Sequence, residues 1–199
     1  MRGYFGVGVE GISKPMNVGN LVRSSHAFGA SFFFTIGAEY SAAQAASDTS
    51  KAPGHMPIYT WATVADMVMP QGCALVGVEL TDEAIELPSF GHPLRAAYVL
   101  GPERGSLSPA MLARCRYVIR IPTTFCINVA TAGAIVMYDR TKNLGRHAPR
   151  PVTEGPPSEA MQATRHGPPV ARKGRGGAAT EIDVVRAAAA KNREGPTCD

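Results

Sequence analysis

The sequence lacks a cysteine pattern that would cross-link a small domain or hold a metal ion. Its four cysteines, Cys73, Cys115, Cys126 and Cys198, form no C-x-x-C pair and show none of the regular spacing of a small secreted framework. We therefore expect free thiols, a reducing compartment and no metal site.

Long apolar runs are also missing. No stretch approaches the roughly 18 apolar residues that a membrane-spanning helix needs, and the first residues, MRGYFGVGVEG, lack the apolar core of a signal peptide. These absences predict a soluble, cytoplasmic protein with no membrane partner.

Excess charge is absent from the first part of the chain. Residues 1–140 hold ten basic and ten acidic side chains, whereas residues 141–199 hold ten basic and six acidic ones and so carry the whole net charge of +4. The second segment also contains seven Pro and seven Gly, and such a composition buries too little apolar surface to offset its chain entropy. We predict a folded domain over residues 1–145 and a basic, largely disordered tail over residues 146–199, with a short helix starting near Thr180.

Short apolar segments alternate with helical segments along the predicted domain. Strands are predicted at residues 4–9, 31–37, 74–80, 96–101 and 117–122, and helices near residues 18–28, 108–115 and 128–140. Residues 38–58, rich in Ala, Ser and Pro, are predicted to be a connecting loop. The alternation indicates an α/β domain with a mainly parallel sheet and helices on both faces.

The stretch GVGVEG matches the dinucleotide-binding pattern G-x-G-x-x-G at Gly6, Gly8 and Gly11. A true fingerprint opens a helix directly after the strand and has an acidic residue about 20 positions further on. Here the glycines lie within and just after the strand, the helix begins only near Asn17, and residues 26–34 contain no carboxylate. The spacing therefore argues against a nicotinamide-dependent dehydrogenase.

The stretch PMNVGNLVRSSHAFGA, residues 15–30, places amides, a glycine and a cation at a helix start. Asn17 can act as an N-cap, and Gly19 lets a ligand or another backbone come close. Arg23 lies one turn beyond Asn20 on the same helical face. Free N–H groups and a guanidinium suit an anion such as an RNA phosphate, although a capped helix with a solvated arginine has the same pattern.

Two further stretches place polar residues directly after a strand. The strand that ends at Gly101 runs into a charged turn with Glu103 and Arg104, and ligands of α/β sheets bind at this edge. The strand that ends near Ile121 runs into a polar loop, with Asn128 at a helix start. Taken singly, these stretches also fit a solvated turn and a capped helix.

Taken together, the three stretches resemble the signature of the SpoU/TrmH branch of the SPOUT RNA methyltransferases. That signature reads N-x-G-x-x-x-R followed by F-G, then G-x-E-x-G-L running on to I-P, then a small polar residue, an aliphatic residue, Asn and an Ala-rich helix. The corresponding residues are Asn17, Gly19, Arg23, Phe28, Gly29, Gly101, Glu103, Gly105, Leu107, Ile121, Pro122, Cys126, Ile127, Asn128 and Val129. The resemblance covers roughly residues 4–140.

The resemblance implies an α/β fold with a C-terminal trefoil knot, a rare exception to the usual rules of chain topology. It also implies a homodimer that binds S-adenosylmethionine and methylates a ribose 2′-hydroxyl of tRNA or rRNA, with tRNA favoured by the minimal architecture. By position, the cofactor-binding residues would be Val78, Gly101, Ile121, Cys126 and Ile127. The reaction site would comprise Asn17, Arg23, Glu103 and Asn128.

The implied reaction explains these residue types. Methyl transfer to a weakly acidic ribose hydroxyl needs alignment of the reacting atoms, which alone can supply roughly 7–11 kcal/mol. A guanidinium rarely gives up its proton, so we assign Arg23 to clamping a phosphate and the developing oxyanion. Glu103 would orient Arg23 or a neighbouring amide, and Asn17 and Asn128 would fix the ribose.

The sequence departs from the family pattern in three places. Cys126 stands where a Ser is usual, and its thiol forms weaker hydrogen bonds than a hydroxyl. The segment before it is also shorter than usual, so Thr123 or Thr124 would supply the missing hydroxyl. No RNA-binding domain precedes the first strand, so we expect recognition by the dimer surface and by RKGRGG (172–177), which fits a solvated linker equally well.

Two alternative functions stay open. One is a non-catalytic RNA-binding protein that retains the knotted fold, which the presence of Asn17, Arg23, Glu103 and Asn128 disfavours. The other is a methyltransferase that acts on a base nitrogen, which the N-x-G-x-x-x-R motif disfavours.

Overall fold

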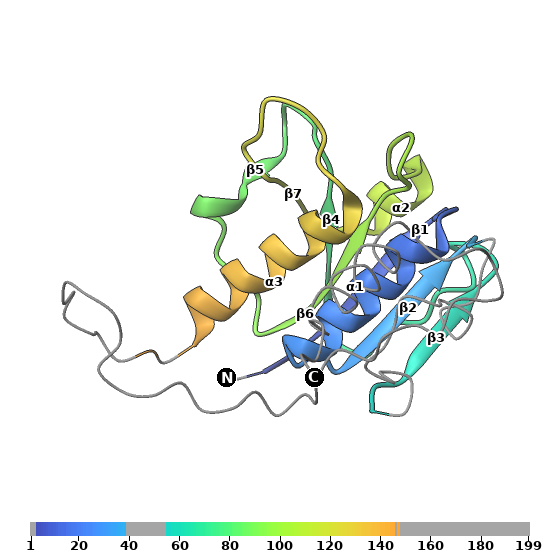
Figure 1. Cartoon of the computed structure of the whole chain (residues 1–199), viewed down its shortest axis with the longest axis horizontal. Helices are drawn as coiled ribbons and strands as arrows, with labels where there is room; N and C mark the ends of the chain where they lie inside the picture. Colours follow the sequence, from blue (N-terminus) through green and yellow to red (C-terminus); the bar gives the residue numbers. More distant parts are fainter. Residues whose placement is uncertain (1–2, 39–54, 146, 148–199) are drawn as a thin grey trace, which may run out of the picture. The chain divides into compact units, whose positions relative to one another are not determined.

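The computed structural model describes residues 3–38, 55–145 and 147, which build one parallel sheet with helices packed on it (Figure 1). The strands follow the order β3-β2-β1-β6-β4-β7-β5, and each pairing between neighbours is parallel. The strands are β1 (Tyr4–Glu10), β2 (Phe32–Ile36), β3 (Ile58–Trp61), β4 (Ala74–Val78), β5 (Ile85–Glu86), β6 (Arg95–Leu100) and β7 (Tyr117–Arg120). The helices are α1 (Pro15–Ala27), α2 (Pro109–Arg114) and α3 (Val129–Leu144), with a short 3-10 helix, η3 (Leu87–Ser89).

The two faces of the sheet bury different apolar clusters. On one face α1 and α3 lie side by side and cover Phe5, Val7 and Val9 of β1 (Figure 1). On the other face Met111 of α2 belongs to the cluster that contains Phe34 of β2. The predicted α/β fold, with a mainly parallel sheet and helices on both faces, is confirmed.

Gly6 and Gly8 occur in β1 because the neighbouring strand carries phenylalanine rings. A Cβ atom at Gly6 would lie 2.3 Å from the ring of Phe32, and one at Gly8 would lie 2.3 Å from the ring of Phe34. Gly11, with φ +63°, turns the chain after the strand. The glycine pattern therefore serves strand packing, in agreement with the sequence argument against a dinucleotide site.

The strands β3 and β5 are absent from the sequence prediction. They are only four and two residues long and are exposed at most positions, so they lack the continuous apolar run of a buried strand. β3 begins at Ile58, the last residue of the predicted loop. No helix in the described ranges is long and apolar enough to cross a membrane.

Four further predictions remain untested. Apart from residue 147, the predicted tail lies outside the described residues, and so does the helix expected near Thr180. The domain boundary at residue 145 therefore stays a prediction. Strand order and pairing do not establish the trefoil knot, which also stays a prediction.

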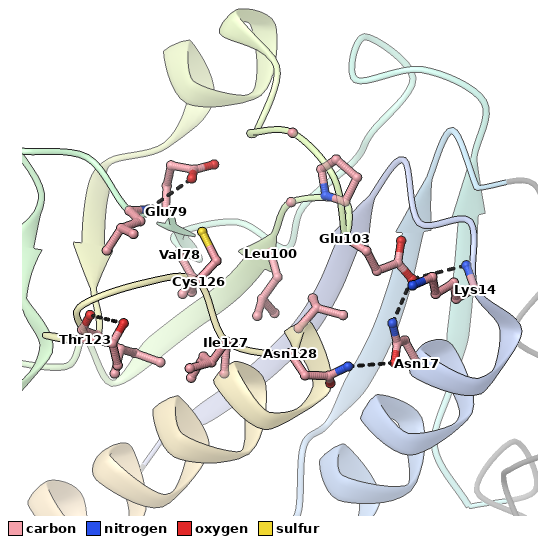
Figure 2. Close-up of a pocket in the computed structure, with 17 residues that line it drawn as sticks. Lys14, Asn17, Val78, Glu79, Leu100, Glu103, Thr123, Cys126, Ile127 and Asn128 are labelled. Carbon is pink, nitrogen blue, oxygen red and sulfur yellow. Dashed lines mark hydrogen bonds between the residues drawn. The ribbon is translucent and has the colours of Figure 1, made fainter.

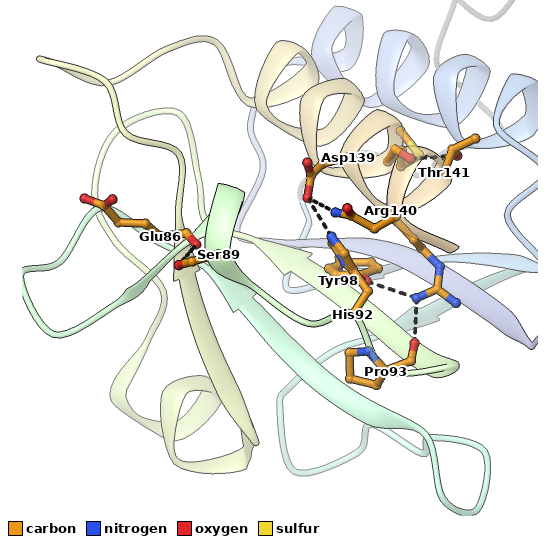
Figure 3. A network of polar contacts seen from close by, with 10 residues as sticks. Glu86, Ser89, His92, Pro93, Tyr98, Asp139, Arg140 and Thr141 are labelled. Atoms are coloured by element: carbon orange, nitrogen blue, oxygen red, sulfur yellow. Dashed lines mark hydrogen bonds and ion pairs between the residues drawn. The ribbon is translucent and has the colours of Figure 1, made fainter. Parts of the chain in front are cut away.

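Arg140 anchors α3 to the sheet from within the core (Figure 3). Its side chain is fully buried, and its guanidinium lies 5.2 Å from the centroid of the Phe5 ring. The guanidinium donates hydrogen bonds to the Tyr98 hydroxyl and to the backbone carbonyls of Tyr4, Pro93 and Leu94. Charge-assisted bonds to several partners compensate for the cost of burying this cation.

His92 extends this polar network to the surface of α3 (Figure 3). Its Nδ1 lies 2.6 Å from the hydroxyl of Tyr98, and its Nε2 lies 2.9 Å from the carboxylate of Asp139. Burial lowers the pKa of His92 against the opposing effect of Asp139, and burial raises the pKa of Tyr98 to about 12. These contacts tie the last turns of α3 to β6 and to the residues just before it.

Candidate active site

A pocket of about 390 Å³ opens at the carboxyl ends of β4, β6 and β7, beside the first turns of α1 and α3 (Figure 2). Ligands of parallel α/β sheets bind at this edge. All five predicted cofactor-binding residues line the pocket: Val78, Gly101, Ile121, Cys126 and Ile127. Three of the four predicted reaction-site residues also line it: Asn17, Glu103 and Asn128.

Asn17 joins two segments that lie far apart in the sequence (Figure 2). Its side-chain N–H donates to Glu103 Oε1 at 2.9 Å, and its side-chain oxygen accepts a hydrogen bond from Asn128 Nδ2 at 3.0 Å. The residue is only 7% exposed, so these bonds satisfy an amide that has largely lost its water. We call Asn128, Asn17 and Glu103 the amide chain.

The predicted N-cap role of Asn17 is wrong. Helix α1 begins at Pro15, and Lys14 occupies the N-cap position without a capping bond from its own side chain. The carboxylate of Glu103 instead accepts from the backbone N–H groups of Ser13 and Lys14, at 3.2 and 3.1 Å. A distant loop thus binds the start of α1, and the side chain of Asn17 is left to form the amide chain.

Asn128 is the N-cap of α3, at the helix start that the sequence predicts. Its side-chain oxygen accepts from the backbone N–H groups of Ala130 and Thr131, at 2.9 and 3.4 Å. Helical N–H groups can only donate, and an ionised carboxylate can only accept. The orientation of both amides in the amide chain is therefore fixed at its two ends, by α3 and by Glu103.

Glu103 is ionised and saturated with donors. Burial alone would raise the pKa of its carboxyl, but hydrogen bonds from Asn17, Ser13 and Lys14 outweigh this effect and lower it. The Ser13 hydroxyl donates as well, at 3.3 Å. A carboxylate with a lowered pKa and four donors is a weak base. Its geometry suits orienting Asn17 more than removing a proton.

Two carboxylates, from the strands on either side of β6, fix the loop between β6 and α2. Glu79, which follows β4, accepts from the N–H of Leu107 at 2.7 Å. Glu10, the last residue of β1, accepts from the N–H of Ser108 at 2.9 Å and from its hydroxyl at 2.6 Å. Ser108 also caps α2 by accepting from the N–H of Met111, so the predicted start of this helix is confirmed.

Gly101 lets this loop fold back tightly over the end of β6. A Cβ atom at this position would lie 3.2 Å from the backbone nitrogen of Leu107 and 3.6 Å from the carboxylate of Glu79. Both neighbours are held by the hydrogen bond between them, so neither can give way easily. A residue with a side chain at position 101 would therefore displace this loop, which borders the pocket beside β6.

Arg23 does not line the pocket. It lies on the exposed side of α1, one turn beyond Asn20, which is also exposed. The structure therefore brings three predicted reaction-site residues together and leaves Arg23 on the helix surface beyond them.

Cys126 is exposed and lines the pocket in the loop before α3 (Figure 2). Its thiol is free, as are those of Cys73 and Cys115. Of the two threonines expected to supply a hydroxyl, Thr123 lines the pocket and its hydroxyl lies 3.4 Å from the carbonyl of Ile121.

Sequence reasoning missed Glu10, Glu79 and Lys14. Lys14 and Glu79 line the pocket, and Glu10 binds the loop after β6 from the adjacent strand β1. A usable signal exists in the sequence, since both glutamates end or follow apolar strand segments, GVGVE and ALVGVE. An acidic residue at that position faces the loops of the carboxyl edge.

The family model described as the SpoU rRNA Methylase family matches residues 5–138 of the chain. Curated protein sequences yield no match.

Several solved structures have a similar fold. An AdoMet-bound rRNA methyltransferase from Sinorhizobium meliloti aligns with a TM-score of 0.65 and 19% identity, over 72% of this chain and 58% of that one. The SpoU methyltransferase AviRb from Streptomyces viridochromogenes aligns with a TM-score of 0.62 and 20% identity, over 73% and 62%. The A. aeolicus TrmH/SpoU tRNA modifying enzyme aligns with a TM-score of 0.57 and 17% identity, over 70% and 74%. The chain thus spans less than two thirds of the first two structures.

Proposed function

Because the chain belongs to the SpoU rRNA methylase family, we propose that it transfers a methyl group from S-adenosylmethionine to a ribose 2′-hydroxyl of RNA. The amide chain, which borders the pocket at the strand ends, is the observation that carries this proposal. It places oriented amide groups beside a cavity. Methyl transfer depends on aligning the ribose hydroxyl with the methyl group, and oriented amides can hold the ribose in place.

The pocket fits the proposed cofactor. Its volume of about 390 Å³ lies in the range of small-molecule sites, roughly 300–1,000 Å³. Val78, Leu100 and Ile127 provide apolar walls for an adenine ring, and the bare backbone of Gly101 allows close approach. When bound, S-adenosylmethionine supplies an electrophilic methyl group on its sulfonium.

The amide chain would position the ribose. Asn17 and Asn128 each use one side-chain N–H within the chain, so a second N–H on each remains to donate to a hydroxyl oxygen. Glu103 would act as a positioning residue, because its pKa is lowered and its oxygens already accept four hydrogen bonds.

The RNA backbone would lie along the surface beside the pocket. Lys14, an exposed residue at the pocket edge, and Arg23, further along the exposed side of α1, supply two cations on the same helix. We assign both to phosphate binding, with Arg23 also stabilising the developing oxyanion. The homodimer, the knot and tRNA as the favoured substrate belong to the same proposal.

The test is methyl transfer from labelled S-adenosylmethionine to fractionated cellular RNA, with the modified nucleoside mapped. We expect a 2′-O-methylated nucleoside, and a base-methylated product would contradict the ribose assignment. Cofactor binding measured by calorimetry without any transfer to RNA would favour the alternative of a non-catalytic RNA-binding protein.

A further inference from the structure

Four aromatic side chains form a continuous cluster on β2 and β3, away from the pocket of the amide chain. Phe32 and Phe34 on β2 are buried, whereas Tyr59 on β3 is 49% exposed. The rings of Tyr59 and Trp61 stack on each other, with their planes 10° from parallel and their centroids 5.8 Å apart. The two phenylalanine rings contact them from beneath, Phe32 against Tyr59 and Phe34 against Trp61.

This cluster forms one wall of a second cavity, also about 390 Å³. The cavity is lined by Phe32, Tyr59, Trp61, Val68, Met69 and Pro70. Val68, on the opposite wall, is 74% exposed. β3 lies at the edge of the sheet (Figure 1), so the cavity opens at the side of the domain. We call it the aromatic groove.

Two guanidinium groups flank the loop that forms the opposite wall. Arg114 donates to the backbone carbonyls of Val64 and Met67, just before Val68. The guanidinium of Arg95 packs against Gly72. Its central carbon lies 3.2 Å from the place that a Cβ atom of Gly72 would occupy. Residues 62–73 contain one acidic side chain, Asp66, and its carboxylate accepts from the N–H and hydroxyl of Thr63. The two guanidinium groups beside this loop therefore outnumber the one carboxylate that the loop carries.

The groove residues pack on the α2 face of the sheet, whereas Leu100, which lines the pocket, packs on the face that α1 and α3 cover, so one RNA strand would contact both by passing round the carboxyl edge of the sheet. Strand pairing aligns Leu100, which lines the pocket, with Val9, then Thr35, then Thr60. Thr60 stands between Tyr59 and Trp61, so the backbone of β3 lies three strand spacings, or about 14 Å, from Leu100 within the sheet, and the path from one face to the other is longer than this.

We propose that the aromatic groove holds an unpaired nucleobase of the RNA substrate, a few nucleotides from the methylated ribose. The inference rests on the proposed function for the identity of the substrate. Aromatic rings stack with any nucleobase, aliphatic side chains can cover its other face, and guanidinium groups bind the adjoining phosphates. The groove would thus recognise a single-stranded region rather than a particular base.

Tryptophan fluorescence tests the groove directly, because Trp61 is the only tryptophan in the chain. Single-stranded oligoadenylate is titrated into the full-length protein, with free tryptophan as the control for light absorption by the RNA. We expect saturable quenching of Trp61. Absence of saturable quenching in the wild type would overturn the proposal.

Two variants examine the contact. Tyr59→Ala should weaken oligoadenylate binding by about 5- to 150-fold, the effect of losing one stacked base. Val68→Asp places a negative charge on an already exposed position, so it should weaken binding without risk to the fold. The matched controls are Tyr138→Ala and Leu94→Asp, at positions 62% and 52% exposed elsewhere. Equal affinities in Val68→Asp and Leu94→Asp would overturn the proposal even if Tyr59→Ala failed to fold.

The groove and the proposed function can fail separately. If quenching is present but no RNA is methylated, the groove binds RNA and the proposed function is wrong. If RNA is methylated with unchanged KM in Tyr59→Ala and Val68→Asp, the function stands and the groove assignment is wrong. S-adenosylmethionine affinity, measured by calorimetry, should be unchanged in both variants.

Discussion

The side-chain N–H of Asn128 donates to the side-chain oxygen of Asn17 at 3.0 Å, across 111 positions of sequence. This bond links the start of α3 to the start of α1. Asn17 in turn donates a hydrogen bond to Glu103. Since the donors stand at the α3 end and the carboxylate of Glu103 stands at the other end, Asn17 cannot turn over without losing two bonds, and Asn128 cannot turn over without losing three. These bonds therefore favour one orientation of both amides.

Replacing Asn17 by aspartate should destabilise the protein. The new carboxylate cannot donate to Glu103 and places a second negative charge about 3 Å from it. We expect a loss of about 1–3 kcal/mol in the free energy of unfolding, measured by urea denaturation at neutral pH. The loss should shrink in acid, where one of the two carboxylates is protonated.

Asn20→Asp is the matched control, since Asn20 is exposed on the same helix. Its effect should stay within about 0.5 kcal/mol. Equal losses in the two variants would contradict the amide chain.

Glu103 should make stability depend on pH in acid. Its pKa in the folded protein is lowered from the ordinary value of 4.5, so its stabilising contribution is complete above that value. The contribution disappears as the pH falls through the lowered pKa. Wild type should therefore be more stable than Glu103→Gln above pH 4.5, and the difference should vanish in stronger acid. Urea midpoints measured across this range would show it, and a difference that persists in strong acid would contradict it.

Glu79→Ala should weaken S-adenosylmethionine binding. The substitution removes the acceptor for the N–H groups of Leu107 and Leu80, so the loop beside Gly101 loses the bond that fixes it. Calorimetry should give a dissociation constant raised about 10-fold, or about 1.4 kcal/mol. Glu83→Ala, at an exposed glutamate four residues further on, should leave the affinity unchanged.

The strands of the sheet centre could be predicted because they are short apolar runs bounded by glycine or charge. β1, β2 and β6 are buried at nearly every position, and such runs carry their own signal. β3 could not be predicted in the same way. It is exposed or half-buried throughout, and its place is set by pairing with β2.

The site could be predicted only where a motif names the residue. The local sequence predicts a helix cap at Asn17, because nothing near it indicates that Glu103 binds the backbone of Ser13 and Lys14. The hydrogen bonds of Glu10 and Glu79 likewise join residues that only folding brings together. Local sequence indicates which side chains can bind, but the partner depends on the strand order.

Arg23→Ala should abolish methyl transfer, with a loss of at least about 100-fold, while S-adenosylmethionine still binds. The residue lies outside the pocket, so its loss should leave the pocket walls intact. Calorimetry and a methyl-transfer assay on the same preparation would separate the two effects. Arg116→Ala, at another exposed arginine, is the control and should remain active. A loss of cofactor affinity that matches the loss of activity would place Arg23 on the cofactor side instead.

Cys126→Ser should be nearly neutral. The thiol is exposed at the pocket edge and free, and a small side chain at this position suffices if the loop backbone makes the contacts. A covalent role would need an activated thiolate, but PTTFCINV offers neither Lys nor His beside it. Covalent catalysis by a thiolate also needs an electrophilic ring carbon, which a ribose hydroxyl does not provide.

We therefore expect Cys126→Ser to retain at least about a tenth of the activity, a barrier change below roughly 1.4 kcal/mol. Steady-state rates for Cys126→Ser and Cys126→Ala decide the matter, since a fall of several orders of magnitude in both would mean that the thiol takes part in a different reaction.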